Sequence, residues 1–285
     1  MTSPTLAAIH IYPVKSCRAV ALDEVAVAET GLANDRLYQV VDANGAAITQ
    51  RQHRILATVQ PALIDGGVRL EVDGRSALDV AAPSAADRDA TNLIGVPIQV
   101  GDAGDDAAAW FSELVGEPAR LVALTPDFEL IVPGFGFRTS LADAAPVLVA
   151  NAASAEWLAA RASEPFGMDR FRPNLTVEGV PAWDEETWSA FTIGGAELGL
   201  GLPWPRCAIP QIDQQTAERH KEPAKVLREY RWCEQGTMPD LSLAFLEGNG
   251  LFGMACTIGA PGTTVRVGDE VTVTTRQDPL LPPPG

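Results

Sequence analysis

The chain has 285 residues, 46% of them hydrophobic and 20% charged, which is typical of a globular protein with a substantial core. Its net charge of -16 argues against a nucleic-acid-binding protein, because such proteins need a basic surface, and against docking on anionic lipid. The most apolar segment, 144–153, is too short to cross a bilayer and the N-terminus has no basic targeting region, so we expect a cytoplasmic protein with no membrane or nucleic-acid partner.

The first 125 residues are predicted to be rich in strands. Three apolar or alternating runs favour strands, at residues 6–12, 37–41 and 68–72. Residues 42–45 have the composition of a turn and lead into a further extended segment at 46–50. The apolar residues in 110–115 follow helical spacing, and Gly116 provides a stop signal for that helix.

The remainder also reads mainly as strands. Residues 125–139 are rich in proline, glycine and phenylalanine without a clear period, and we place a domain boundary there. A helix capped by Asn151 or Ser154 is expected to follow. Later strand signals are a run at 175–178, a hairpin across Gly194-Gly195 and an alternating stretch at 263–275. These patterns predict an α+β, β-rich chain with a barrel-like part, divided into residues 1–125, residues 126–276 and a disordered tail at 277–285.

Cys207 is the first candidate for chemistry, because prolines stiffen the loop around it and Arg206 precedes it. A neighbouring guanidinium favours the thiolate, which is the form that binds soft metals. The alternative is a free cysteine that acts as a small buried hydrophobe, and the local sequence does not decide between the two. Cys17, Cys233 and Cys256 form no Cys-x-x-Cys pair, and we expect them to be core residues.

Two basic segments in the first half could hold an anion. Lys15 and Ser16 follow the first predicted strand, where an ammonium and a hydroxyl can contact a phosphate. No glycine-rich loop precedes them, and a solvated lysine is the alternative. Arg36 and Arg51 lie near predicted strand ends and carry the planar fork that suits phosphate. Asp35 could instead hold Arg36 in a structural ion pair.

Two further segments flank the cysteine loop in the second half. Arg172 and Asn174, in Arg-Phe-Arg-Pro-Asn, offer several donors and an amide acceptor, which suit the edge of a heterocycle such as a pterin. The alternative is the start of a strand with exposed arginines. Asp213 follows the loop and could carry a proton, but the local sequence favours a residue that caps a turn.

Taken in chain order, these segments resemble the two-domain MOSC family, and in particular its amidoxime-reducing components. The motifs that carry the resemblance are Ile11-Tyr-Pro-Val-Lys-Ser-Cys17, Asn34-Asp-Arg36, Arg170-Phe-Arg-Pro-Asn174, Arg206-Cys207, Ile212-Asp213 and Val267-Gly-Asp269. Each motif is short, but their order and spacing together make the resemblance specific. It covers nearly the whole chain.

The resemblance implies an N-terminal β-barrel domain, a β-barrel MOSC domain with a few helices, and a bound molybdenum cofactor (Mo-molybdopterin). By analogy with the family, Cys207 is the protein ligand to molybdenum. The other implied contacts are Lys15, Ser16 and Arg36 to the cofactor phosphate, and Arg172, Asn174 and Arg206 to the pterin. Asp213 is the candidate for proton handling near the metal. A local cluster of cations would let a chain of net charge -16 hold an anionic cofactor.

The implied activity is the reduction of N-hydroxylated compounds such as hydroxylamines, amidoximes and N-hydroxylated nucleobases. The chain carries no ferredoxin-like extension, so we expect electrons from a separate electron-transfer protein, either a ferredoxin or a flavin- or haem-type reductase. The alternative is a carrier of the molybdenum cofactor or a sulfur-handling protein without reductase turnover, because MOSC domains also occur in molybdenum cofactor sulfurases. A protein of the same fold that has lost its cofactor is a third reading, which the retained basic residues and Cys207 argue against.

Overall fold

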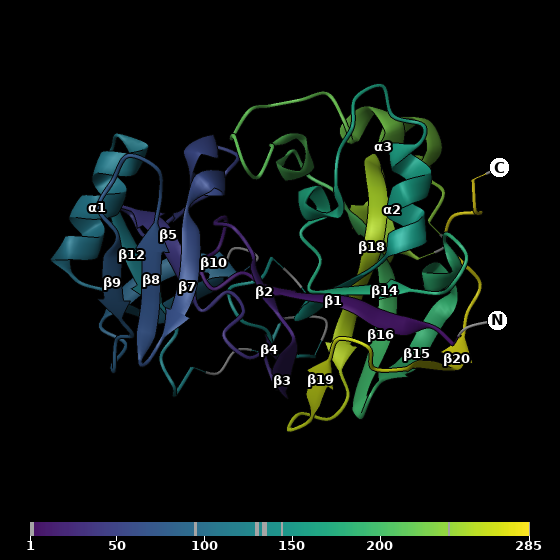
Figure 1. Cartoon of the computed structure of the whole chain (residues 1–285), viewed down its shortest axis with the longest axis horizontal. Helices are drawn as coiled ribbons and strands as arrows, with labels where there is room; N and C mark the ends of the chain where they lie inside the picture. The colour runs from purple at the N-terminus through teal and green to yellow at the C-terminus, as the bar shows by residue number, and fades with distance from the viewer. Residues whose placement is uncertain are drawn as a thin grey trace.

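The fold is described from a computed structural model of the chain, shown in Figure 1. The structure describes residues 3–93, 96–128, 131–132, 136–143, 145–238 and 240–284. Two lobes lie side by side in Figure 1, one around the helix α1 and one around the helices α2 and α3. Strands β1 to β4, from the first part of the chain, connect the lobes or belong to the second one.

The largest sheet combines strands from both ends of the chain. Its strands run in the order β2-β1-β14-β13-β18-β16-β15-β20, and β17 pairs with β18 beside this path. The bounds are β1 Thr5–Ile11, β2 Val20–Leu22, β13 Val147–Asn151, β14 Leu175–Glu178, β15 Trp188–Ile193, β16 Ala196–Pro205, β17 Trp232–Cys233, β18 Asn249–Ile258 and β20 Val271–Arg276. The pair β13 and β14 is parallel and the other pairs are antiparallel.

This sheet curls until β1 reaches its opposite end. Along its length β1 pairs with β14, and its start also meets the turn before β20. There the Val271 N–H donates to the Pro4 carbonyl at 2.8 Å, and an isolated bridge joins Thr5 to Glu270. The result is a barrel-like shape that is not closed by a continuous ladder.

The first lobe is built from two smaller sheets. One runs β10-β11-β12-β5-β6 and the other β7-β8-β9, while β19-β3-β4 forms a third small sheet beside the second lobe. The bounds are β3 Glu24–Ala28, β4 Gly31–Leu32, β5 Tyr38–Asp42, β6 Ala47–Ile48, β7 Gln60–Ile64, β8 Gly67–Glu71, β9 Leu78–Ala81, β10 Arg88–Leu93, β11 Val96–Asp102, β12 Ala119–Ala123 and β19 Thr264–Arg266.

The helices cover the open faces of the sheets. They are α1 Asp105–Val115, α2 Ala152–Ala159 and α3 Ala224–Tyr230, with 3₁₀ turns η1 Arg54–Thr58, η2 Met168–Phe171, η3 Asp184–Thr187, η4 Ile209–Gln211 and η5 Leu241–Leu246. As predicted, α1 ends at Gly116, whose φ of 80° is left-handed. Of the two predicted caps for α2, Asn151 is the one used, and its side chain accepts from the Ala153 N–H at 3.0 Å.

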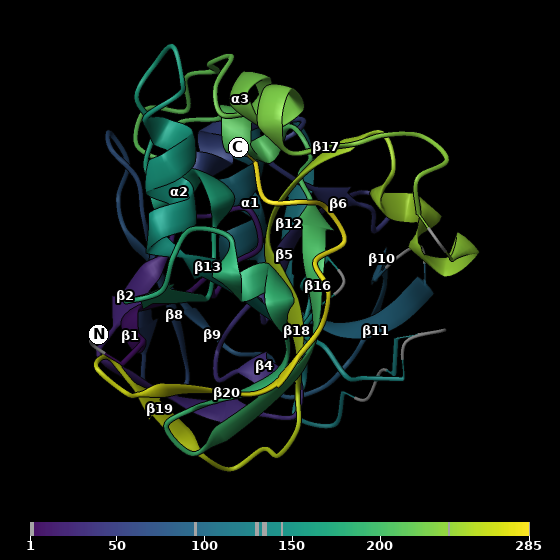
Figure 2. The same ribbon diagram turned by 90° about the vertical axis from the view of Figure 1, so that its right-hand side faces the viewer.

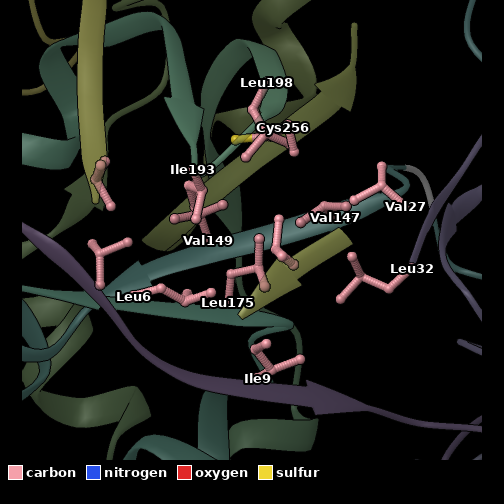
Figure 3. Close-up of a cluster of buried hydrophobic side chains, with 14 of the residues drawn as sticks. Leu6, Ile9, Val27, Leu32, Val147, Val149, Leu175, Ile193, Leu198 and Cys256 are labelled. Atoms are coloured by element: carbon pink, nitrogen blue, oxygen red, sulfur yellow. The ribbon is translucent and has the colours of Figure 1, made fainter. Parts of the chain in front are cut away.

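The main core fills the inside of the curled sheet. Figure 3 shows Leu6 and Ile9 from β1 pointing toward Val149 and Leu175 from β13 and β14. A separate cluster in the first lobe packs α1 against β5, β8 and β12. Figure 2 shows α2 and α3 together near one end of β18, where a third cluster lies.

The β-rich α+β class predicted from the sequence is confirmed. The runs at 6–12, 37–41, 68–72 and 175–178 correspond to β1, β5, β8 and β14, and the Gly194-Gly195 hairpin joins β15 to β16. The pattern did not predict β18, because its residues are buried on both faces and do not alternate. No described helix has the length and apolar character needed to span a membrane.

The predicted domain limits, 1–125, 126–276 and 277–285, stay predictions. Strands from the first range hydrogen-bond to strands of the second, so the sequence limits are not limits of the sheets. In the expected disordered tail, Leu280 and Leu281 contact a small apolar cluster, and the Pro282 carbonyl accepts from Arg231 at 3.0 Å. Gly285 lies outside the described residues.

Candidate active site

A cavity of about 450 Å³ collects side chains from distant parts of the chain. The predicted cofactor and metal contacts that line it are Lys15, Ser16, Arg36, Arg172, Asn174, Arg206 and Cys207. They come from loops after β1 and β4, from the segment between η2 and β14, and from the loop after β16. The structure therefore brings together seven residues that the sequence spreads over almost 200 positions.

Tyr12 organises the arginines of the cavity. Its ring lies under two guanidinium carbons, 4.6 Å from that of Arg36 and 4.1 Å from that of Arg172. The Tyr12 hydroxyl donates to the Pro173 carbonyl at 3.0 Å, and its N–H donates to Asp35 Oδ1 at 2.7 Å. Burial raises the pKa of Tyr12 to about 12, so the ring carries no charge at neutral pH.

Asp35 does form the ion pair with Arg36 that was the alternative to phosphate binding. Arg36 nevertheless lines the cavity, so the pair and the cavity role coexist. Arg36 Nη1 donates to Asp35 Oδ2, while the Tyr12 ring packs against the guanidinium. Asp35 is 1% exposed, which makes it a buried anchor for Arg36.

Three residues of the cavity have backbone conformations that are unfavourable for side-chain-bearing residues. Ser16, Arg36 and Arg172 have φ of 69°, 50° and 54°. These three are half of the six non-glycine residues with positive φ in the described part of the chain. Such strain costs roughly 1–3 kcal/mol per residue and is concentrated at functional sites. The fold thus sustains strain at the positions where the cavity needs these side chains.

The lining is strongly cationic. Lys15, Arg36, Arg51, Arg172 and Arg206 face one acid among the described lining residues, Asp143. Lys15 Nζ lies 2.8 Å from Asp143 Oδ1. Burial alone would raise the pKa of this carboxyl, but Lys15 and the nearby arginines hold it below its usual range. An excess of positive charge in a chain of net charge -16 indicates a site for an anion.

Cys207 is the one exposed cysteine of the four, all of which lie in the described part of the chain. The Ile209 N–H points at its sulfur, with a nitrogen–sulfur distance of 3.5 Å. Burial raises the pKa of Cys17 to about 12 and also raises the pKa of Cys233 and Cys256. Cys207 is therefore the cysteine placed to ligate a soft metal.

Arg206, next to Cys207, has one buried N–H donor without a hydrogen-bond partner among the described residues. Its Nη2 donates to the Phe171 carbonyl at 2.6 Å, but its buried Nε has no hydrogen-bond partner among the described residues. Burial lowers the pKa of Arg206 to about 10, an effect that the neighbouring Cys207 opposes. The unpartnered Arg206 Nε lies in a cationic cavity beside the free thiol of Cys207. This combination is suited to an anionic ligand that contains a soft metal.

Asn174 and Arg172 use much of their hydrogen-bonding capacity within the protein. Asn174 Oδ1 accepts from the Leu148 N–H at 3.1 Å and from Arg36 at 3.2 Å, and Nδ2 donates to the His10 carbonyl at 3.2 Å. Arg172 Nη1 donates to Gln214 Oε1 at 2.9 Å. Both residues line the cavity, while Asn174 also joins β1 to β13 and Arg172 contacts the loop that carries Gln214.

Asp213 lies outside the cavity lining. Its Oδ1 accepts from the N–H groups of Gln215 and Thr216 at 2.8 and 2.9 Å, which is the turn-capping arrangement that the local sequence favours. Partial burial would raise the pKa of Asp213, but these hydrogen bonds and Arg170 lower it. A role in proton handling stays a prediction.

Sequence reasoning did not assign several residues that shape the site. Tyr12 was present in a recognised motif, and Arg51 was noted as suited to phosphate but was not among the cofactor contacts that the resemblance implies. Asp143 and Trp204 line the cavity but carry no local signal, because their position follows from the fold of the surrounding loops. Gln50 and Gln214 contact the cavity residues from behind and could be found only from the structure.

The comparisons with known proteins agree with the resemblance. Residues 3–118 match the family described as MOSC N-terminal beta barrel domain, and residues 137–272 match the MOSC domain. The mitochondrial amidoxime reducing component 2 of Rattus norvegicus is 30% identical over 94% of this chain and 82% of its own length. The mitochondrial amidoxime-reducing component 1 of Homo sapiens is 30% identical with the same shares. A molybdenum cofactor sulfurase of Danio rerio is 31% identical over 81% of this chain, which spans 31% of that protein.

Proposed function

The chain belongs to the two-domain MOSC family, and on this basis we propose that it is a molybdenum cofactor-dependent oxidoreductase that reduces N-hydroxylated compounds. The observation that carries the proposal is the cavity in which five cations and the exposed thiol of Cys207 meet. A cationic cavity is suited to an anionic cofactor, and a thiolate is suited to molybdenum. The amidoxime-reducing relatives support reduction as the reaction.

The residues of the cavity divide the binding work between them. Lys15, Ser16 and Arg36 are proposed to hold the cofactor phosphate, since a point charge, a hydroxyl and a planar fork all suit phosphate oxygens. Arg172, with Asn174 beside it, is proposed to contact the pterin. Tyr12 keeps Arg36 and Arg172 apart and oriented before any ligand arrives.

At the other part of the cavity, Cys207 is proposed to be the metal ligand. The Ile209 N–H points at the Cys207 sulfur, and the unpartnered Arg206 Nε would be available to donate to a bound cofactor. When bound, the molybdenum cofactor supplies the two-electron reduction, which breaks the N–O bond with the uptake of two protons and releases water. The chain's own residues fix the orientation of the cofactor and neutralise its charge.

The electrons are proposed to come from a separate electron-transfer protein of the ferredoxin, flavin or haem type. The electron donor and the cytoplasmic location expected from the sequence stay predictions. The substrates proposed are hydroxylamines, amidoximes and N-hydroxylated nucleobases. They share an N–OH group whose nitrogen takes up a proton when the N–O bond breaks.

The proposal is tested by molybdenum content and by turnover. The protein, produced in a host that makes the cofactor, is expected to contain stoichiometric molybdenum and to reduce hydroxylamine with chemically reduced viologen as donor. Cys207→Ala is expected to abolish this reduction, whereas Cys233→Ala, which removes a buried thiol outside the cavity, is expected to retain it. Absence of molybdenum in the unmodified protein, or undiminished reduction by Cys207→Ala, would contradict the proposal.

The relationship to molybdenum cofactor sulfurase supports one other candidate, a carrier that binds the cofactor without reducing a substrate. The same experiment separates the two. A carrier contains molybdenum that Lys15 and Arg36 variants lose, but it reduces no N-hydroxylated compound with any chemical donor.

A further inference from the structure

The rim of the cavity next to Cys207 is apolar. Trp204, three positions before the cysteine, and Ile209, two positions after it, both line the cavity. Trp204 stands near the end of β16, where the register with β18 shifts between Pro203 and Pro205. Such an irregularity re-aims a side chain and is common next to active sites. The flanking prolines fix the backbone there, so the indole is held in place before a ligand binds.

A second aromatic ring supports Trp204. Phe245, in η5, has its ring centroid 5.8 Å from that of Trp204, with the ring planes inclined by 54°. The segment that carries η5 lies between β17 and β18 and extends away from the curled sheet in Figure 2. Trp204 is half-buried and lines the cavity, whereas Phe245 lies outside the lining and packs against the Trp204 ring.

The charged groups of the cavity come from other elements. Lys15, Arg36 and Arg51 belong to loops of the first part of the chain, whereas Trp204 and Ile209 flank Cys207. Arg206 directly precedes Cys207, and its Nη2 is committed to the Phe171 carbonyl. The cavity thus offers cations for an anion and a separate apolar wall beside the thiol.

We propose that Trp204, supported by Phe245, binds a planar aromatic group of the substrate, so that the preferred substrates are N-hydroxylated compounds with an aromatic ring next to the N–O group. This inference rests on the proposed function and names the substrate class of the same site. An aromatic ring placed against Trp204 displaces water from the surface beside Cys207 and brings the attached N–O group to the thiol end of the cavity.

Two amidoximes that differ only in the attached group test the proposal. Benzamidoxime carries a ring and acetamidoxime a methyl group, and both present the same neutral reacting group. Their dissociation constants are measured by calorimetric titration of the oxidised, molybdenum-loaded protein without an electron donor, so that binding is read without turnover. The ratio of kcat/KM for the two compounds is then measured with reduced viologen.

The expected result is a preference for benzamidoxime that depends on Trp204. Trp204→Ala is expected to reduce the benzamidoxime-to-acetamidoxime affinity ratio by about tenfold, since an aromatic pair adds to the loss of apolar contact. Phe245→Ala is expected to reduce the ratio by a smaller factor, and Trp204→Phe to restore most of it. Trp110→Ala, which removes a tryptophan from α1, is the matched control and is expected to leave the ratio unchanged.

Equal affinity for the two amidoximes in the unmodified protein, or an unchanged ratio in Trp204→Ala, would overturn the inference. Molybdenum content is measured for each variant, and Trp204→Phe and Phe245→Ala decide the matter if Trp204→Ala does not load. Failure of the proposed function has a different signature: neither amidoxime is reduced, although the affinity ratio still depends on Trp204. If both compounds are reduced but the benzamidoxime-to-acetamidoxime affinity ratio does not depend on Trp204, only the proposed role of Trp204 is refuted.

Discussion

The side-chain amides of Gln50 and Gln214 donate to each other in both directions, at 3.0 and 3.1 Å. The two residues are 164 positions apart, and both are buried. Gln50 Nε2 also donates to the Ser16 carbonyl at 2.7 Å, and Gln214 Oε1 accepts from Arg172 at 2.9 Å. The buried amide pair therefore connects two loops that contribute residues to the cavity, one from each half of the chain.

Replacing Gln214 with leucine is expected to loosen both loops. Gln214→Leu leaves Arg172 Nη1 and the Gln50 amide without their buried partner, which costs about 1–3 kcal/mol of unfolding free energy. Molybdenum content is expected to fall as well, because Arg172 is no longer held. Urea unfolding and metal analysis measure the two effects, with Gln215→Ala at the exposed neighbouring position as the control.

A double-mutant cycle with Gln50→Leu separates the amide pair from the rest of the site. The loss in the double variant is expected to be smaller than the sum of the single losses, by about 0.5–3 kcal/mol. Additive losses, or a Gln214→Leu protein that is as stable and as well loaded as the unmodified one, would show that the pair does not support the cavity.

The backbone conformation of Arg172 predicts that a glycine variant is more stable than an alanine variant, which is the reverse of the usual order. Its φ of 54° and ψ of 48° are left-handed, which costs a side-chain-bearing residue roughly 1–2 kcal/mol but costs glycine little. Arg172→Gly and Arg172→Ala both remove the guanidinium. Arg172→Gly is nevertheless expected to unfold at a higher urea concentration than Arg172→Ala, whereas at an ordinary position glycine is the less stable. An alanine variant of equal or greater stability would argue against strain at this residue.

Removing the one acid among the described lining residues is expected to strengthen anion binding. Asp143→Asn frees Lys15 and removes a negative charge, so the affinity for inorganic phosphate should rise by a factor of about 2–5, as expected for a partly exposed charge pair. Calorimetric titration at low and high salt measures the change, which should shrink as salt rises. Asp65→Asn removes the same charge from an exposed turn and is expected to have little effect. Weaker phosphate binding by Asp143→Asn would mean that Asp143 orders Lys15 more than it competes with an anion.

The buried pair of Glu186 and Arg231 makes a prediction about pH. Burial raises the pKa of Glu186 to about 7 although Arg231 opposes this, whereas the ordinary value is 4.5. Between these two values the folded protein holds a proton that the unfolded chain releases, so the contribution of Glu186 to stability falls as pH rises from 4.5 to 7. The total fall is about 3 kcal/mol from the size of the shift.

Glu186→Gln removes this titration and keeps the shape of the side chain. The unfolding free energy of the unmodified protein minus that of Glu186→Gln is therefore expected to decrease as pH rises from 4.5 to 7. Urea unfolding at a series of pH values measures this difference. A difference that stays constant or grows over that range would mean that Glu186 is ionised throughout and paired with Arg231.

The sequence predicted which residues line the cavity better than it predicted their supporting contacts. Cys207 and the basic residues were singled out because their short motifs, taken in chain order, resemble one family, whereas the local sequence left an alternative open for each of them. The hydrogen bonds of Asn174 to His10 and Leu148, and the amide pair of Gln50 and Gln214, depend on how distant strands are brought together. No local pattern reports such contacts, because they form only after the sheet has assembled.

The elements show the same division. The strand at 175–178 and the stop at Gly116 follow from alternation and from glycine, and both were predicted. The long strand β18 was not, although it lies at the centre of the sheet, because continuous burial removes the period on which the prediction depends. The role of Asp213 was open in the sequence, and the local hydrogen bonds favour a turn cap.

The place of β1 in the large sheet also constrains the order in which the chain can be completed during synthesis. Its end pairs with the nearby β2, but β14 and the turn at Glu270, which complete its pairing, follow it by more than 160 residues. β1 must therefore wait for residues far along the chain before both of its edges are satisfied. Contacts of such long sequence separation slow folding and leave a strand edge exposed meanwhile, so we expect folding of this chain to depend on protection of its own N-terminal segment.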